Sequence, residues 1–536
     1  MRIHWKLIFI AIFLFLIPLS SFSQHYYTPL QRDITRMYDH SVYGFHPTFH
    51  TSVKPYISNE VEEFVDPDSV MYFDRKKEIW SDKWIGRKIW REHLLDHREE
   101  DFHVWASPYI EFVGGSASDD LGSKTMTINS RGIVAGGEFG ERFSFQTSFM
   151  ESLAEFPNYV DSLVEATNVV PGGARTKTLN GRYDYGTVNG TISYRLKKYF
   201  SFQFGHDKNF IGDGYRSMLL SDNTYNYPFF KINANFWKIK YMVLYTFFQD
   251  GPYQTINDDA FDRKYGTFHY LDINIGKRLS LGLMEAIIWD DSARGYDINY
   301  LNPIIFLRPV EFSIGSPDNV LLGFNLKYMT TENSYIYGQL MLDEFKINEV
   351  KSGNGWWGNK QGFQLGARAF HFLGVKHLDV FAEYNYARPY LYQHRTTRTA
   401  YAHFNQPLAH PLGANFTEAI AGVSWAYKGL NAEVMVNIAQ VGYDYDSIGN
   451  PANYGNNVLL SYDSRELEYG NETGQGLTTD MTHISFRTWY VINPAYNLAL
   501  QGGVRIRNTK NRIGTSNTTF YFLGITTSLT NRYLDF

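Results

Sequence analysis

The chain has 536 residues, no cysteine, and a formal net charge of −5, from 50 Lys and Arg against 55 Asp and Glu. Without cysteine it forms neither disulfides nor thiolate metal sites, and its near-neutral charge gives no electrostatic reason to bind nucleic acid. A mean hydropathy of −0.33 disfavours a helical membrane protein, whereas 40 Phe, 40 Tyr and 11 Trp suit a transmembrane barrel, whose strands are apolar on one face only.

The N-terminus resembles a secretory signal peptide over residues 1–23. Arg2 and Lys6 precede an apolar run over residues 7–19, and Ser21 and Ser23 supply small residues before a cleavage site. The run is too short for a bilayer span of roughly 20 residues. We therefore expect export across the inner membrane, to a soluble compartment or to the outer membrane of a Gram-negative bacterium.

Residues 24–103 are predicted to form a periplasmic helical segment. Apolar residues recur at spacings of three to five among charged ones, which is a helical period. Helices over residues 66–101 are expected to pack against the periplasmic mouth of a barrel through Trp80, Trp84, Ile85, Trp90 and Leu94.

The same stretch contains a possible pair of zinc ligands. His93 and His97 would lie on one face of a helix, four residues apart, but no third ligand can be placed. No metal site is predicted from this pair.

From residue 104 onward the hydrophobic period changes to two. Apolar and polar residues alternate over 143–149, 200–204 and 239–245. About 18 such strands are predicted, near residues 104, 132, 142, 185, 199, 227, 238, 264, 279, 320, 333, 361, 377, 416, 430, 482, 496 and 518. The residues expected to face lipid are Phe143, Phe145, Phe200, Phe202, Val243, Tyr245, Ile273 and Leu523.

The fold class predicted for residues 104–536 is an all-β transmembrane structure, an antiparallel outer-membrane β-barrel. The alternative, a soluble sandwich or propeller, does not account for the alternation of short and long connections between strands. Residues 530–535 break the strand pattern and are expected to form a short tail.

Sequence fragments that resemble catalytic or cofactor motifs are incomplete. A dinucleotide fingerprint at residues 212–217 has Ser217 in place of its third glycine, and a calcium-like loop at residues 444–455 has Ile448 at a ligand position. No zinc-protease, hydrolase or P-loop pattern occurs. The protein is therefore predicted not to be an enzyme and to bind no cofactor, although a hydrolase whose groups converge only in space would escape this test.

The long loops combine aromatic rings with amide and guanidinium groups. Sugars present apolar C–H faces and many hydroxyls, so binding them requires flat rings beside planar polar groups. The predicted saccharide-binding residues are Trp356, Trp357, Asn359, Tyr390, Tyr392, Arg395, Arg398 and Tyr401. Alternatively, such rings form the aromatic girdle at the membrane interface.

Three stretches resemble the capsule-assembly Wzi family, and within it the RemB-like branch linked to gliding motility. They are residues 204–221, 299–311 and 406–416. The matching residues are Gly205, Gly212, Asp213, Gly214, Arg216, Ser217, Asn302, Pro303, Arg308, Glu311, His410, Pro411 and Asn415. Where Wzi-like chains have Trp-Gly-Pro-Gly, this chain has a different sequence at residues 210–214.

The resemblance implies an 18-stranded outer-membrane barrel with a periplasmic helical bundle and no catalytic mechanism. It also implies a surface protein that binds or organises cell-surface polysaccharide and serves gliding motility or adhesion. Its expected partners are outer-membrane lipid, polysaccharide, and gliding or secretion machinery, but no nucleic acid. The alternative is a porin or transporter channel. We expect the apolar stretch within residues 291–319 to fold inward as a plug, which disfavours an open channel.

Overall fold

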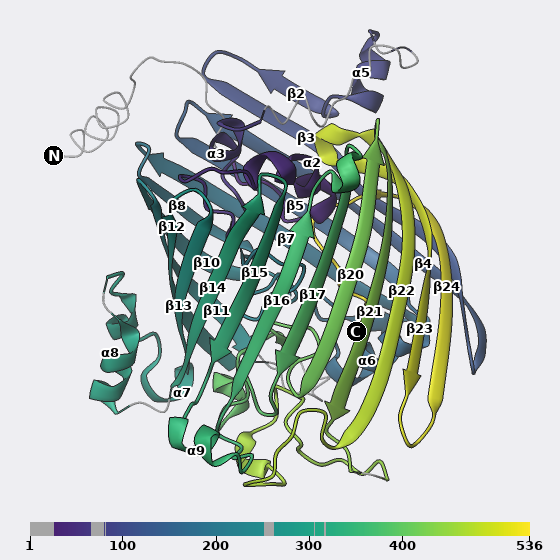
Figure 1. Ribbon diagram of the computed structural model, residues 1–536. Coiled ribbons are helices and arrows are strands. Elements are labelled where there is room, and N and C mark those ends of the chain that lie inside the picture. The colour runs from purple at the N-terminus through teal and green to yellow at the C-terminus, as the bar shows by residue number, and fades with distance from the viewer. Residues whose placement is uncertain are drawn as a thin grey trace, which may run out of the picture.

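The computed structural model describes residues 26–65, 80, 82–250, 262–304, 306–315, 318–446 and 448–536. The fold is a closed antiparallel barrel of 18 strands, as predicted (Figure 1). The predicted signal peptide and residues 66–79 of the predicted helical segment lie outside the described residues. No helix in the described part of the chain is long and apolar enough to cross a membrane.

The wall strands follow one another around the barrel in chain order, and β24 pairs with β3 to close it. The first nine are β3 (Phe102–Asp119), β4 (Gly122–Phe139), β5 (Phe143–Glu155), β7 (Arg182–Leu196), β8 (Phe200–Asp207), β10 (Tyr227–Phe236), β11 (Ile239–Asp250), β12 (Asp262–Ile275) and β13 (Leu279–Asp290). The others are β14 (Asn319–Thr331), β15 (Ser334–Leu342), β16 (Gln361–Ala369), β17 (Leu378–Ala387), β20 (Phe416–Tyr427), β21 (Leu430–Tyr443), β22 (Leu477–Asn493), β23 (Leu498–Lys510) and β24 (Thr515–Thr527). Two short strands, β2 (Leu95–Arg98) and β6 (Lys177–Leu179), extend the sheet at β3 and β7.

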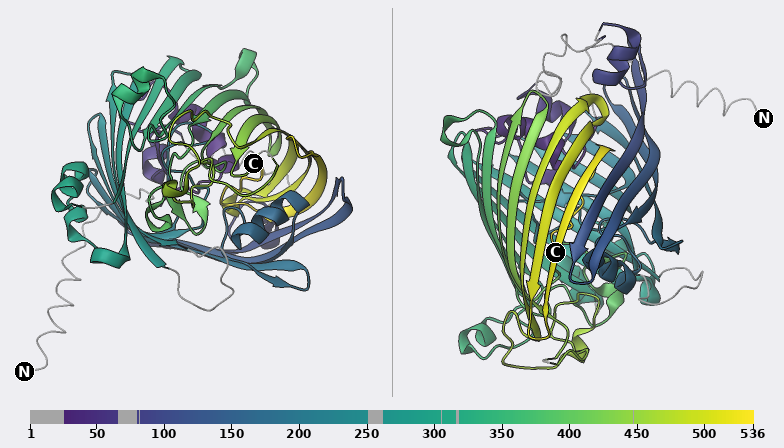
Figure 2. Two further views of the ribbon diagram at one scale, coloured as in Figure 1. Left: turned by 90° about the horizontal axis from the view of Figure 1, so that it is seen from below. Right: turned by 90° about the vertical axis from the view of Figure 1, so that its right-hand side faces the viewer.

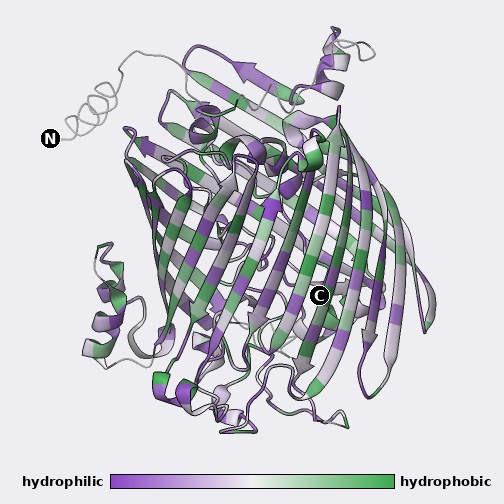
Figure 3. Ribbon diagram, in the orientation of Figure 1, coloured by the Kyte–Doolittle hydropathy of each residue, from purple (hydrophilic) through white to green (hydrophobic). Residues whose placement is uncertain are grey.

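Apolar and polar residues alternate along the strands, and this alternation sets which side chains face outward (Figure 3). Phe143 and Phe200 are each 36% exposed and Leu523 is 66% exposed, in agreement with the predicted register. Tyr245 also lies on the outward face but is buried rather than exposed to lipid, because its hydroxyl donates to the carbonyl of Leu301 at 2.7 Å. Val243, on the same face, is buried as well.

The two ends of the barrel differ in their connections. At the turn end, which is uppermost in Figure 1, the connections are short: 140–142, 197–199, 237–238, 276–278, 332–333, 370–377, 428–429 and 494–497. The opposite, loop end carries the long connections. Two tight hairpins at the loop end, residues 120–121 and 511–514, depart from the predicted alternation.

The turn end is closed by residues 26–65, which we call the N-terminal plug (Figure 1). It contains α2 (Arg32–Val42), α3 (Ser58–Glu62) and β1 (Val53–Lys54). Asp39 pairs with Arg368 at 2.9 Å and Glu60 pairs with Lys240 at 2.9 Å, so charges on both helices bind inward-facing residues of the wall. Tyr43, at the end of α2, stacks on Tyr335 with ring centres 4.6 Å apart.

The expected helical packing over residues 66–101 is wrong where the structure describes it. A helix, α5, covers only Trp84–Trp90, and Trp80, Trp84, Ile85 and Leu94 are 60%, 61%, 55% and 49% exposed. The chain then becomes strand β2, so His93 and His97 do not share a helix face. The N-terminal plug buries apolar side chains against the mouth, and Trp80, Trp84, Ile85 and Leu94 do not.

Further segments fill the lumen and close its loop end (Figure 2). The crossing segment, residues 208–226, carries β9 (Phe210–Ile211), which pairs with β1 of the plug. Residues 388–415 include β18 (Ala402–His403) and β19 (Gln406–Pro407) and close the loop end together with residues 444–476. The C-terminal tail, residues 528–536, leaves β24 and turns inward, where the main-chain oxygen of Phe536 accepts a hydrogen bond from Arg507 Nε at 2.9 Å.

The predicted internal plug at residues 291–319 lies outside the barrel instead. Its elements are α7 (Asp291–Arg294), a short 3-10 helix (Ile298–Leu301) and α8 (Leu307–Ile314). Figures 1 and 2 place α8 beside the outer face of the wall.

A cavity of about 290 Å³ remains between the N-terminal plug and the wall from β3 to β8. Its lining includes Trp105, Tyr109, Thr187 and Lys208, and it reaches exposed Asp96 and Arg98 at the turn end. Thr187 therefore faces the cavity, whereas the adjacent Val188 is 46% exposed on the outer face of β7.

These two neighbours test the assignment of the lipid face. Replacing Val188 by Lys should lower the free energy of unfolding by about 2 to 4 kcal/mol, because its ammonium group would enter hydrocarbon. Thr187→Lys should cost less than about 1 kcal/mol, since the ammonium group would reach the polar cavity. Urea unfolding in lipid vesicles measures both, and an equal loss for the two variants would contradict the register.

Candidate functional site

The crossing segment folds across the lumen because two glycines allow wall side chains to approach it closely. Gly212 has φ of +145°, and a Cβ there would lie 2.4 Å from Gln339 Nε2. A Cβ on Gly214 would lie 2.5 Å from a carboxylate oxygen of Glu383. A side chain at either position would displace the ends of Gln339 or Glu383, which hold hydrogen bonds to the segment.

A row of inward polar side chains on neighbouring strands receives this segment. Asn325, Gln339, Gln364, Asn385 and Glu418 are successive cross-strand partners on β14, β15, β16, β17 and β20. Gln339 accepts the backbone N–H of Met218 at 2.8 Å and donates to the carbonyl of Ile211 at 3.1 Å. Gln364 donates to the carbonyl of Arg216 at 3.0 Å.

Glu383, also on β17, binds the turn of the segment. Its carboxylate accepts the backbone N–H groups of Tyr215 and Arg216 at 2.8 and 3.1 Å. The wall thus binds the backbone of the crossing segment, and its side chains pair the N–H groups of residues 215, 216 and 218 and the carbonyls of residues 211 and 216.

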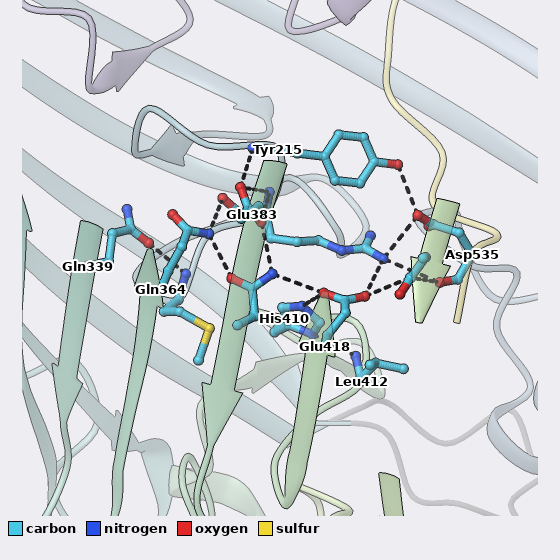
Figure 4. A network of polar contacts seen from close by, with 12 residues as sticks. Tyr215, Gln339, Gln364, Glu383, His410, Leu412, Glu418 and Asp535 are labelled. Carbon is cyan, nitrogen blue, oxygen red and sulfur yellow. Dashed lines mark hydrogen bonds and ion pairs between the residues drawn. The ribbon is translucent and has the colours of Figure 1, made fainter. Parts of the chain in front are cut away.

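The Arg216 guanidinium joins three parts of the chain, and Figure 4 shows the Glu418 and Asp535 carboxylates with which it pairs. Its Nη2 lies 3.1 Å from Glu418 Oε1 on the wall and 3.1 Å from Asp535 Oδ2 in the C-terminal tail. Glu418 also lies 2.7 Å from His410 Nε2 and accepts the Asn437 amide at 2.7 Å. We call Arg216, His410, Glu418 and Asp535 the lumen network.

The other residues of the family resemblance lie in three places. Asp213 and Ser217 belong to the crossing segment, and Asp213 accepts the Asn325 amide at 3.1 Å. Asn415 ties the loop-end segments together by donating to the carbonyls of Gly442 and Gln475 at 2.7 and 3.0 Å. Gly205 lies on β8, just before the crossing segment, and a Cβ there would lie 2.6 Å from Thr191. Pro411 directly follows His410 of the lumen network.

The third group lies outside the barrel. Arg308 and Glu311 form an ion pair on α8, and the Asn302 side chain accepts the backbone N–H of Ile304 at 3.0 Å, with Pro303 between them. The residues of the family resemblance therefore do not form one site, because some lie in the lumen and others lie outside the barrel.

At the loop end, Trp356 and Trp357 form one cluster with Tyr390 and Tyr462. Both indole N–H groups donate to the same oxygen of Glu468, at 3.2 and 3.0 Å. The Arg465 guanidinium lies 4.3 Å from the centre of the Trp357 ring and Lys346 lies 4.4 Å from that of Trp356. Each Trp is 8% exposed, so the pair forms a floor rather than an open platform.

Three of the predicted saccharide rings have no exposed surface. Tyr392 and Tyr401 stack at 5.5 Å in the lumen, and their hydroxyls donate to the carbonyls of Met218 and Leu219 at 2.7 and 2.6 Å. Tyr390 donates to the carbonyl of Asn453 at 3.1 Å. A ring enclosed on both faces cannot stack on a sugar, so these tyrosines hold the lumen segments in place.

The predicted polar partners divide in the same way. Asn359 is buried and accepts the backbone N–H of Lys346 at 2.8 Å. The side chains of Arg395 and Arg398 are 68% and 42% exposed and pair with Asp463 and Asp262. Sequence analysis missed Glu468 and the exposed Tyr445 and Tyr469, because no local pattern separates an exposed loop tyrosine from a buried one.

Charge at the loop end is shaped by close contacts. The hydrogen bond from Arg465 lowers the pKa of Glu468 and keeps it ionised, which favours donation from the two indoles. Burial lowers the pKa of His394 to about 3, so this ring is neutral at physiological pH. Among the described residues, no cluster of three His, Asp or Glu side chains could hold a metal ion.

Removing a carboxylate from the lumen network should destabilise the barrel strongly. Glu418→Gln leaves a buried guanidinium with one of its two anionic partners, so the free energy of unfolding should fall by about 3 to 5 kcal/mol. Asp463→Asn removes an exposed partner of Arg395 and should cost about 0 to 1 kcal/mol. Chemical unfolding of both variants in the same vesicles measures the difference, and equal effects would contradict a structural role for the network.

Comparisons with known proteins give a fold but no family. No family model and no curated protein match the sequence. The structure is similar to Wzi, an outer membrane protein involved in group 1 capsule assembly in Escherichia coli and a carbohydrate-binding β-barrel, with a TM-score of 0.54 and 13% identity over 92% of this chain and 98% of that one. It also matches OprD of Pseudomonas aeruginosa (TM-score 0.40, 11% identity, 78% and 94% covered) and OccAB2 of Acinetobacter baumannii (0.41, 9%, 78% and 97%). The Wzi match supports an outer-membrane type of barrel, and membership of the Wzi family or its RemB-like branch stays a prediction.

Proposed function

We propose that this protein is a non-enzymatic surface protein of a Gram-negative outer membrane that binds or organises cell-surface polysaccharide through its loop end. The observation that carries the proposal is the closed lumen, which is crossed by residues 208–226 and filled from both ends. A filled lumen leaves the exposed loops as the surface available to a polymer. The fold shared with Wzi, a carbohydrate-binding barrel, supports the same conclusion.

The proposed contact surface is a set of exposed and half-buried side chains next to the tryptophan floor. Tyr469 is 49% exposed and directly follows Glu468, which accepts both indole N–H groups. Arg395 lies close to Tyr462, because the Arg395 carbonyl accepts the hydroxyl of the adjacent Ser461 at 2.6 Å. We call the set the loop patch: Arg395, Tyr462, Asp463, Arg465, Glu468 and Tyr469. Rings next to planar polar groups match the apolar faces and hydroxyls of sugars.

In this proposal the turn end faces the periplasm and the loop patch faces the cell exterior. Weak contacts along a repeating polymer would add up through multivalency. Binding would serve gliding motility or adhesion, with gliding or secretion machinery as partners.

The alternative function is a porin or transporter. The cavity of about 290 Å³ that reaches in from the turn end is the observation in its favour. Conductance in planar lipid bilayers separates the two functions, because a porin gives stepwise currents and a closed barrel gives none. Stepwise currents together with no polysaccharide binding would favour the channel.

A single ring in the loop patch offers a direct test of binding. Tyr469→Ala should weaken binding of surface polysaccharide from the source bacterium roughly fivefold, since a stacked ring contributes about 1 kcal/mol. Ile513→Ala, at another exposed position 59% accessible to solvent, is the matched control and should bind normally. Biolayer interferometry on protein in nanodiscs measures both, and unchanged binding by Tyr469→Ala would remove the loop patch from the proposal.

A further inference from the structure

The connection between β13 and β14 forms an arm on the outside of the barrel. We call its described residues, 291–304 and 306–315, the exterior arm. The arm leaves the wall at the loop end, and α8 lies outside the ring of strands in Figure 1 and in the left view of Figure 2. The apolar residues of this connection therefore lie outside the barrel and not in its lumen.

The inner side of the arm is fixed to the wall by an outward-facing carboxylate. Glu285 lies two residues after Leu283, which is 47% exposed, so both side chains belong to the outer face of β13. The Glu285 carboxylate accepts the backbone N–H groups of Leu307 and Arg308, at 2.7 and 2.8 Å, in the first turn of α8. A bare carboxylate is costly in hydrocarbon, and these two donors satisfy it.

Apolar packing completes the attachment. Tyr300 and Leu307 are fully buried against Tyr265, Ile287 and Trp289 of the wall. The arm is thus held in a defined position along the barrel by hydrogen bonds and by packing.

The outer side of the arm carries large apolar side chains that touch little of the protein. Ile298, Ile304, Phe306 and Phe312 are 74%, 84%, 78% and 80% exposed. Concentrated exposed apolar surface marks a contact with lipid or protein.

The neighbouring wall identifies which contact this is. Leu322, the cross-strand partner of Glu285, is 42% exposed on the lipid-facing wall, and Phe324 on the same strand is also 42% exposed. The apolar side of the arm continues this surface outward. Arg308, whose side chain is 59% exposed, lies on α8 between Phe306 and Phe312 and could reach lipid headgroups while the rings enter the acyl region.

We propose that the exterior arm inserts into the membrane leaflet nearer the loop end, with Ile304, Phe306 and Phe312 in contact with lipid acyl chains. The arm would widen the contact between barrel and membrane on one side and fix the rotation of the barrel relative to lipid. This inference does not depend on polysaccharide binding.

The absence of cysteine makes a site-specific test direct. Phe306→Cys, Phe312→Cys and the control Ile513→Cys each carry one thiol for an environment-sensitive nitrobenzoxadiazole label. In phosphatidylcholine vesicles, acyl-chain spin labels should quench the fluorophore at residues 306 and 312 at least about twofold more than at 513, and iodide in the water should quench it less.

Each other outcome overturns the inference. Iodide quenching equal to that at residue 513 would place the arm in water. Protection from both iodide and lipid spin labels would mean that protein covers it, and crosslinking between labelled copies would identify a second copy of this chain. Normal binding of Phe312→Cys to polysaccharide is expected in every case, so failure here is distinct from failure of the proposed function.

Discussion

The pairing of Arg216 with Glu418 and Asp535 is the contact on which the closed state of the barrel depends. It joins the crossing segment, the wall and the C-terminal tail at one buried guanidinium, at 3.1 Å to each carboxylate. A barrel lumen is lined with polar groups, and a segment that displaces water from it has to satisfy those groups itself. Because a buried ion pair gains little net stability over apolar packing, its main effect here is to select one arrangement of the three segments.

The barrel could be read from the sequence because its determinants are local. Alternation with period two depends on each strand having one lipid face, so neighbouring residues are enough to find the strand and its register. The segment before the barrel was predicted less well, since helical spacing shows that an apolar face exists but not what covers it. Trp80 and Trp84 have that spacing and remain exposed, whereas Tyr43 of the N-terminal plug reaches Tyr335 nearly three hundred residues away.

The candidate site was only partly predictable for the same reason. Tyr392 and Tyr469 are both loop tyrosines beside polar residues, yet one is fully buried and the other is half exposed. The difference comes from the Met218 carbonyl, which accepts the Tyr392 hydroxyl across the lumen and has no signal near Tyr392 in the sequence. The glycines at 212 and 214 belong to an incomplete dinucleotide fingerprint in the sequence, and the Gln339 and Glu383 side chains that approach them lie on distant strands.

The crossing segment and the exterior arm show how one carboxylate can decide where a loop goes. Both loops follow a wall strand and present backbone N–H groups to a glutamate of the wall. The crossing segment follows β8 and binds Glu383 on the distant strand β17, whereas the exterior arm binds Glu285 on β13, the strand that it follows. Glu383 points into the lumen and holds its loop inside, whereas Glu285 points outward and holds its loop outside. Since the facing of a strand residue changes with every step along the chain, the position of each glutamate determines which side of the wall its carboxylate can bind. The composition of a loop therefore does not show whether it lies inside or outside the barrel. The face of the wall on which the bound glutamate lies does.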